Sequence, residues 1–135
     1  MAEPVRILLI DDDPRVGEMT GTYLERENPH FSVTYEQDPA AGLTRIEDED
    51  IDCVIADYDM PEMDGLDLLR RVRHSHPNLP VLIVTGHGNM EVAAKARDAG
   101  AAGYHQKGID SYQYTELAAK VETALEQSGR HPTAE

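Results

Sequence analysis

Short runs of hydrophobic residues alternate along the chain with segments in which hydrophobic positions recur every three or four residues. The runs are rich in Val, Ile and Leu and are too short for buried helices, so they predict β-strands. Several of them end abruptly at acidic or other polar residues. The predicted strands cover residues 5–10, 31–36, 52–57, 80–85 and 103–106.

The segments between these runs have the hydrophobic spacing of helices that pack one face against a sheet. Asp13 suits the N-cap of the first helix and Pro14 its first position, whereas Gly100 suits the C-cap of the fourth. The hydrophobic faces of the five helices are marked by Val16, Met19, Thr20, Tyr23 and Leu24; Ala40, Leu43 and Ile46; Leu66, Leu69 and Val72; Val92, Ala93, Ala96 and Ala99; and Leu117, Val121 and Leu125.

Strands that are hydrophobic throughout and alternate with helices predict a parallel sheet covered on both faces. We therefore expect the α/β class, with a doubly wound five-stranded parallel sheet and five helices. A chain of 135 residues is the size of one ordinary domain. We assign residues 1–127 to it and expect the polar segment 128–135 to be disordered.

The composition limits the partners of this domain. Its 26 acidic and 12 basic residues give a net charge of −14, which repels nucleic acid and anionic membranes. Lysine occurs only at Lys95, Lys107 and Lys120, and an acid-rich, lysine-poor surface suggests a protein suited to high salt. The single cysteine, Cys53, excludes an internal disulfide, and no hydrophobic run approaches the ~18 residues of a membrane span. We expect a cytoplasmic protein.

Four of the predicted strands end in, or are followed by, residues that can hold a cation and a phosphoryl group. Asp11 and Asp12 follow the first strand, Asp57 ends the third, Thr85 ends the fourth and Lys107 follows the fifth. Because ligands bind at the carboxyl ends of parallel strands, these side chains should meet at one edge of the sheet. Clustered carboxylates favour Mg²⁺ (or Mn²⁺), and a carboxylate can accept a phosphoryl group as a nucleophile. The lysine and the metal would neutralise the negative charge of that phosphoryl group.

Four strings of residues make the chain resemble the receiver domain of two-component response regulators, of the type found in the chemotaxis regulator. The resemblance covers about residues 5–125 and implies the flavodoxin-like receiver fold. The strings are Ile7-Leu8-Leu9-Ile10-Asp11-Asp12-Asp13-Pro14, Asp57-Tyr58-Asp59-Met60-Pro61-Glu62-Met63-Asp64-Gly65, Val81-Leu82-Ile83-Val84-Thr85-Gly86 and Ala99-Gly100-Ala101-Ala102-Gly103-Tyr104.

The resemblance implies a role for each residue that matches a family motif. Asp57 matches the phosphoacceptor, Asp12 the direct metal ligand and Asp11 a ligand that acts mainly through water. The backbone carbonyl of Asp59 matches a third protein contact to the metal, and Lys107 matches the phosphate-binding lysine. Thr85 and Tyr104 together match the switch pair, a hydroxyl that turns toward phosphate and an aromatic ring that follows it.

The resemblance also implies partners. A histidine kinase would supply the phosphoryl group, and the domain would catalyse only its own phosphorylation and dephosphorylation. A downstream protein or an output domain would bind the face formed by the fourth helix, fifth strand and fifth helix, on a monomer or weak homodimer.

One departure from the family pattern and two alternative functions remain open. The family usually places proline after its lysine, often through a cis bond, but Gly108 follows Lys107 here, so we expect a trans bond or a mobile loop. One alternative is a receiver-like interaction module that no longer takes phosphate. The other is a phosphatase of the haloacid-dehalogenase type, which would use Asp11 as its nucleophile.

Overall fold

The structure is a computed structural model that describes residues 4–86, 90–108, 110 and 112–129. Strands and helices alternate in the predicted order, and the observed strand bounds differ from the predicted ones by at most one residue. The strands are β1 (Val5–Ile10), β2 (Phe31–Glu36), β3 (Cys53–Asp57), β4 (Val81–Thr85) and β5 (Gly103–Gln106). The helices are α1 (Pro14–Glu27), α2 (Pro39–Asp48), α3 (Gly65–Ser75), α4 (Met90–Asp98) and α5 (Tyr112–Gln127).

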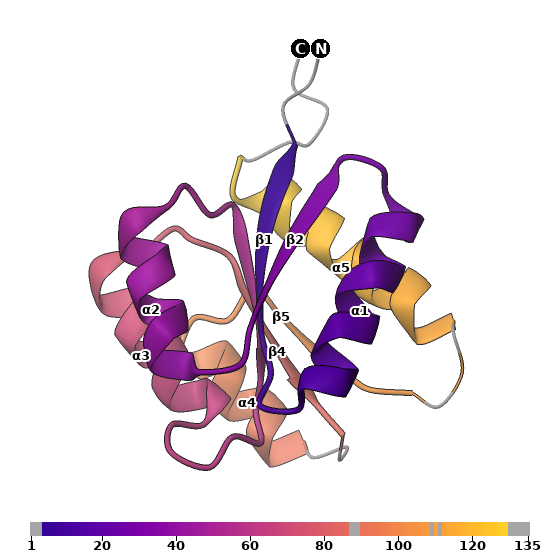
Figure 1. The fold of residues 1–135 in the computed structure, drawn as a ribbon. Helices are drawn as coiled ribbons and strands as arrows, with labels where there is room; N and C mark the ends of the chain where they lie inside the picture. The colour runs from indigo at the N-terminus through magenta and orange to yellow at the C-terminus, as the bar shows by residue number, and fades with distance from the viewer. Residues whose placement is uncertain (1–3, 87–89, 109, 111, 130–135) are drawn as a thin grey trace.

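All strand pairs are parallel, and the five strands form one sheet in the order β2-β1-β3-β4-β5. Helices α1 and α5 cover one face of the sheet, and α2, α3 and α4 cover the other (Figure 1). The predicted doubly wound α/β fold is thus confirmed. In the described part of the chain, no helix combines the length and the hydrophobicity needed to cross a bilayer.

Each face of the sheet has its own hydrophobic core, because successive strand side chains point to opposite faces. Leu8, Val54 and Ile83 pack toward α3 and α4, whereas Ile7, Ile55 and Leu82 pack toward α5. Cys53 is a free thiol buried in the second of these cores. The two cores hold the strands, and with them the residues at the strand ends, in a fixed arrangement.

Short polar side chains set where the helices begin. The Asp13 carboxylate accepts hydrogen bonds from the backbone N–H groups of Arg15 and Val16, which confirms its predicted role as an N-cap. Asp38 caps α2 and Asp64 caps α3 in the same way. At the end of α4, Gly100 has a φ of +97°, and the predicted glycine C-cap is thus confirmed.

The start of α3 lies against the end of β3, where a side chain would not fit. A Cβ atom on Gly65 would lie 2.8 Å from the carbonyl oxygen of Asp57 and 3.0 Å from the Cα of Tyr58. The N–H of Gly65 donates to the carbonyl of Tyr58, which fixes this approach. The glycine therefore holds the loop after Asp57 close to the sheet edge.

Candidate functional site

Three carboxylates meet at the carboxyl edge of the sheet. Asp11 and Asp12 follow β1, and Asp57 is the last residue of the neighbouring strand β3. One oxygen from each of the three lies within 4.8 Å of the others. Asp11 and Asp57 are buried, with 3 % and 6 % of their surfaces exposed, and Asp12 is half-buried. The predicted meeting of these residues is thus observed.

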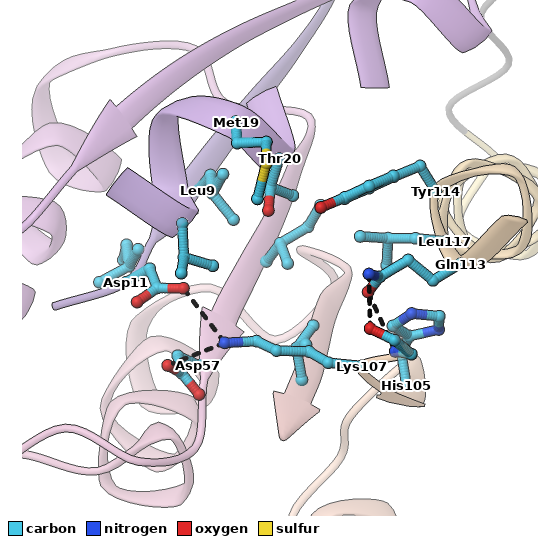
Figure 2. Close-up of a pocket in the computed structure, with 15 residues that line it drawn as sticks. Leu9, Asp11, Met19, Thr20, Asp57, His105, Lys107, Gln113, Tyr114 and Leu117 are labelled. Atoms are coloured by element: carbon cyan, nitrogen blue, oxygen red, sulfur yellow. Dashed lines mark hydrogen bonds and ion pairs between the residues drawn. The ribbon is translucent and has the colours of Figure 1, made fainter. Parts of the chain in front are cut away.

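Lys107 supplies the positive charge that these buried carboxylates need. Its Nζ lies 3.3 Å from Oδ2 of Asp11 and 3.3 Å from Oδ2 of Asp57 (Figure 2). The other oxygen of each carboxylate accepts a backbone hydrogen bond, from the N–H of Asp13 to Asp11 and from the N–H of Asp59 to Asp57. Both side chains are therefore held in place, with one oxygen each directed toward the lysine.

Burial and the neighbouring charges oppose one another at Asp57. Burial raises the pKa of Asp57 to about 6, aided by Asp11 and opposed by Lys107 and the N–H of Asp59. Burial alone would lower the pKa of Lys107, but Asp57 and Asp11 outweigh it and raise that pKa. The lysine is therefore positively charged at neutral pH, and Asp57 carries a charge that is costly to bury.

The donor atoms at this edge suit a small divalent cation. Carboxylate oxygens are hard ligands, and Mg²⁺ needs few of them because it keeps several waters. Asp11, Asp12 and Asp57 can each offer an oxygen, and the exposed Asp59 lies two residues beyond Asp57. Placing a cation there would also relieve the repulsion among the carboxylates.

Thr85 and Tyr104 lie on neighbouring strands and belong to the same face of the sheet. Tyr104 of β5 pairs with Ile83 of β4, two residues before Thr85. Thr85 is buried at the end of β4, and its carbonyl accepts the N–H of Lys107. The Tyr104 ring is half-buried and packs against the core that faces α3 and α4. The structure thus places the predicted switch residues on neighbouring strands, on the face of the sheet opposite α1 and α5.

Two residues that the sequence did not single out also position the site. The Tyr35 hydroxyl donates a 2.6 Å hydrogen bond to the carbonyl of Asp11, which fixes the turn after β1. Burial, followed by the charge of Asp11, raises the pKa of this tyrosine to about 12, so it stays protonated. The second residue, Gln113 in the first turn of α5, binds the loop that follows Lys107.

Gln113 makes two hydrogen bonds to the backbone of Gly108. Its Oε1 accepts the Gly108 N–H at 3.1 Å, and its Nε2 donates to the Gly108 carbonyl at 2.7 Å (Figure 2). The described peptide bonds are all trans, so the prediction for Lys107–Gly108 is confirmed. A proline at position 108 would lose the donor that this pair requires.

We expect Gln113→Ala to loosen the loop after Lys107 without unfolding the domain. Without the hydrogen bond from its N–H group to Gln113, Gly108 should exchange its amide proton roughly fivefold faster. Hydrogen exchange measured by NMR tests this, with Gln127→Ala at the other end of α5 as the matched control. Unchanged exchange at Gly108 would show that Gln113 does not restrain the loop.

Comparison with known proteins places the chain in a family. The family model described as the response regulator receiver domain matches residues 7–121. The transcriptional regulatory protein GlrR of Escherichia coli K12 is 35 % identical over 126 residues, which are 93 % of this chain and 27 % of that protein. FixJ of Bradyrhizobium diazoefficiens is 32 % identical over 90 % of this chain and 57 % of its own length. The chain thus spans between a quarter and somewhat over half of these relatives.

Solved structures agree with this placement. A CheY-like response regulator receiver domain protein from Methanospirillum hungatei superposes with a TM-score of 0.82 at 27 % identity, covering 95 % of this chain and 98 % of that one. A receiver domain protein from Clostridium thermocellum also gives 0.82, at 28 % identity over 93 % of this chain and 97 % of its own. The fold, the strand-end residues and the family match agree, and the chain belongs to the response regulator receiver domains of two-component systems.

Proposed function

We propose that this domain accepts a phosphoryl group on Asp57 from the phosphohistidine of a histidine kinase, with Mg²⁺ (or Mn²⁺) bound to the neighbouring acids. The observation that carries the proposal is the position of Asp57, whose Oδ2 faces the Lys107 ammonium beside Asp11 and Asp12. A nucleophilic oxygen beside fixed positive charge is the arrangement that phosphoryl transfer requires.

The transfer exchanges one bond to phosphorus for another. An Asp57 oxygen forms the new P–O bond while the P–N bond to the kinase histidine breaks, and the imidazole leaves as a neutral ring once it holds a proton. Lys107, already 3.3 Å from Asp57, pairs with the added phosphoryl oxygens, and a cation held by Asp11, Asp12 and Asp57 would lower the charge repulsion between acid and phosphate. Hydrolysis returns the domain to its unphosphorylated state, since water attacks phosphorus and the Asp57 carboxylate leaves.

The remaining parts of the proposal concern partners and setting. The phosphorylated domain binds a downstream protein or an output domain through the face made by α4, β5 and α5. It acts in the cytoplasm as a signalling receiver, without substrates other than its own phosphoryl donor. The net charge of −14 supports a function without direct nucleic acid contact.

Mass spectrometry after incubation with acetyl phosphate and Mg²⁺ tests the function. We expect the mass of one phosphoryl group to be added, and borohydride trapping followed by peptide mapping to place it on Asp57. Omitting Mg²⁺, or replacing Asp12 by Ala, should prevent the reaction, whereas Asp50→Asn on the exposed surface should not. Phosphate on Asp11 would favour the phosphatase alternative, and no phosphate at all would favour the pure interaction module.

The switch should depend on the Thr85 hydroxyl. A phosphoryl group on Asp57 would attract that hydroxyl through a charge-assisted hydrogen bond, leaving space into which the Tyr104 ring turns. We expect a beryllofluoride phosphate mimic to shift the NMR signals of the Tyr104 ring in the wild type but not in Thr85→Ala, with Thr22→Ala on α1 as the control. Equal ring motion in the wild type and Thr85→Ala, or in neither, would exclude this coupling.

We also propose that the fold is adapted to high salt. Repulsion within a domain of net charge −14 is screened in molar salt, where the Debye length is about 3 Å. The melting temperature should therefore rise between dilute and molar KCl. A melting temperature that does not change with KCl concentration would contradict the proposed adaptation to high salt.

A further inference from the structure

Lys107 is held through its backbone on both sides. On one side, its N–H group donates a 2.8 Å hydrogen bond to the carbonyl of Thr85, the last residue of β4. On the other side, the peptide group that joins it to Gly108 is held by Gln113, whose Oε1 accepts the Gly108 N–H at 3.1 Å. Because the planar peptide groups on both sides of the Lys107 Cα are fixed, the direction in which its side chain leaves the backbone is fixed as well.

Gly108 is the point at which the chain would otherwise be free to move. Glycine has the broadest backbone freedom of all residues and no side chain that could pack against its surroundings. The Gln113 carboxamide also donates from Nε2 to the Gly108 carbonyl at 2.7 Å, so it binds the peptide groups on both sides of this glycine. The glycine in turn allows this close approach, since a Cβ atom at residue 108 would lie only 3.3 Å from the Gln113 Cβ.

Gln113 is itself fixed at the start of α5. Asp110 accepts two backbone hydrogen bonds from this first turn, the Tyr112 N–H at its Oδ1 at 3.1 Å and the Gln113 N–H at its carbonyl at 3.3 Å. Further along, α5 packs on the sheet through buried residues such as Leu117. The carboxamide therefore joins the loop after Lys107 to a helix that is anchored in the core.

The Lys107 side chain carries the effect of these restraints to the carboxylates. It extends from just beyond β5, and its Nζ lies 3.3 Å from Oδ2 of both Asp11 and Asp57 (Figure 2). The side chain is 28 % exposed, so the surrounding protein does not enclose it completely. Because the ammonium is a compact charge at the end of a long, flexible stem, a small rotation of the backbone at Lys107 would move it away from these oxygens.

We propose that Gln113 is the positioning residue of Lys107 in phosphoryl transfer. By holding both peptide groups of Gly108, it keeps the lysine ammonium beside Asp57, where the oxygens of the transferred group arrive. This inference rests on the proposed function of the site and adds to it a residue of α5 that acts only through the lysine. The rate of transfer then depends on a contact at the start of that helix.

NMR of the lysine ammonium groups tests the positioning in unphosphorylated protein and divalent-free buffer. The chain has only three lysines, so their signals are readily told apart. Gln113→Met keeps most of the side-chain volume and removes both hydrogen bonds to Gly108. We expect it to speed the exchange of the Lys107 ammonium hydrogens with water roughly fivefold, the factor that corresponds to one net hydrogen bond. Unchanged exchange would show that Gln113 does not position the lysine.

Lys120 is the internal control for a merely structural effect. It lies on the same helix, and its Nζ donates to the Tyr104 carbonyl at 3.0 Å. Its exchange should not change in Gln113→Met. Equal acceleration at Lys107 and Lys120 would mean that α5 has loosened as a whole, and would overturn the proposal. Gln113→Ala serves in the same way if the methionine variant fails to fold.

Phosphorylation by acetyl phosphate and Mg²⁺ tests the consequence for the reaction. Gln113→Met should lower the rate constant of phosphoryl incorporation roughly fivefold, whereas Gln127→Met, at the exposed far end of α5, should not. In a Lys107→Met background the change at Gln113 should have no further effect, because it acts through the lysine.

The outcomes separate this inference from the function on which it rests. A further loss of rate in the Lys107→Met background, or an unchanged rate constant in Gln113→Met despite faster ammonium exchange, would overturn the role of Gln113 in transfer. If the wild type takes up no phosphate at all, the proposed function fails, and the ammonium measurement still decides whether Gln113 holds Lys107.

Discussion

Replacing Lys107 by methionine should destabilise the domain by about 2 kcal/mol at neutral pH in divalent-free buffer. The change keeps much of the side-chain volume but removes the only charge that pairs with both Asp11 and Asp57 among the described residues. Breaking a buried ion pair on one side costs about 3–5 kcal/mol. We expect less because the lysine side chain is 28 % exposed and water screens it.

Urea unfolding measures this loss, and Lys95→Met is its matched control. The Lys95 ammonium lies 4.0 Å from Glu91 in a pair whose side chains are 57 % and 73 % exposed, so its loss should cost only about 0–0.5 kcal/mol. The cost of Lys107→Met should fall when Mg²⁺ is added or when Asp57→Asn is combined with it. If the two lysine variants are equally stable, Lys107 does not neutralise the buried carboxylates.

Asp57→Asn should abolish phosphoryl incorporation and yet stabilise the unphosphorylated domain. The amide cannot act as the nucleophile, so no phosphoaspartate forms at this position. The same change removes a charge whose surroundings, burial above all, raise the pKa of Asp57 from 3.8 to about 6 even with Lys107 beside it, a difference that corresponds to about 3 kcal/mol. The lysine's favourable effect is already included in this difference, but the amide that replaces the carboxylate is itself polar and buried, so we expect a gain of about 1–2 kcal/mol at pH 7.

The pH dependence of the stability gained by Asp57→Asn tests whether the charge on Asp57 is its cause. Because the folded state binds a proton on Asp57 more tightly than the unfolded state, ionisation of Asp57 destabilises the fold. That penalty is complete above about pH 6 and disappears below the unfolded pKa of about 3.8. The advantage of Asp57→Asn in urea unfolding should therefore be largest at pH 7 and fall toward zero below about pH 4. Asp50→Asn, on an exposed loop, should show no such trend. Clear destabilisation by Asp57→Asn at pH 7 would contradict the charged cluster described here.

The sequence predicted the parts of the site that follow from strand ends. Parallel strands bring their carboxyl ends to one edge, and so the sequence alone was enough to place Asp11, Asp57 and Thr85 together. The cap at Asp13 and the C-cap at Gly100 also follow from local backbone chemistry. These predictions depend only on the order of elements and on short-range hydrogen bonds.

Other features depend on contacts that long side chains make between elements, and no periodic pattern of hydrophobic residues predicts such contacts. The pairing of Lys107 with Asp11 as well as Asp57 is one example, since the sequence indicated only a phosphate-binding role for the lysine. Tyr35 and Gln113 are further examples. The Tyr35 hydroxyl reaches the backbone carbonyl of Asp11, which follows the neighbouring strand, and the Gln113 amide reaches the backbone of Gly108 in the loop before α5. His105 lies in a predicted strand, but the contact of its Nδ1 with Lys120 depends on another element, α5.

The contact between α1 and α5 has an optical consequence. Tyr23 and Tyr114 stack across it with ring centroids 4.5 Å apart and planes only 4° from parallel. Rings so close couple their electronic transitions, and the chain contains no tryptophan to mask the signal. Near-ultraviolet circular dichroism should therefore carry a band from this pair. Because one ring belongs to α1 and the other to α5, the band reports on the spacing of the two helices in unlabelled protein.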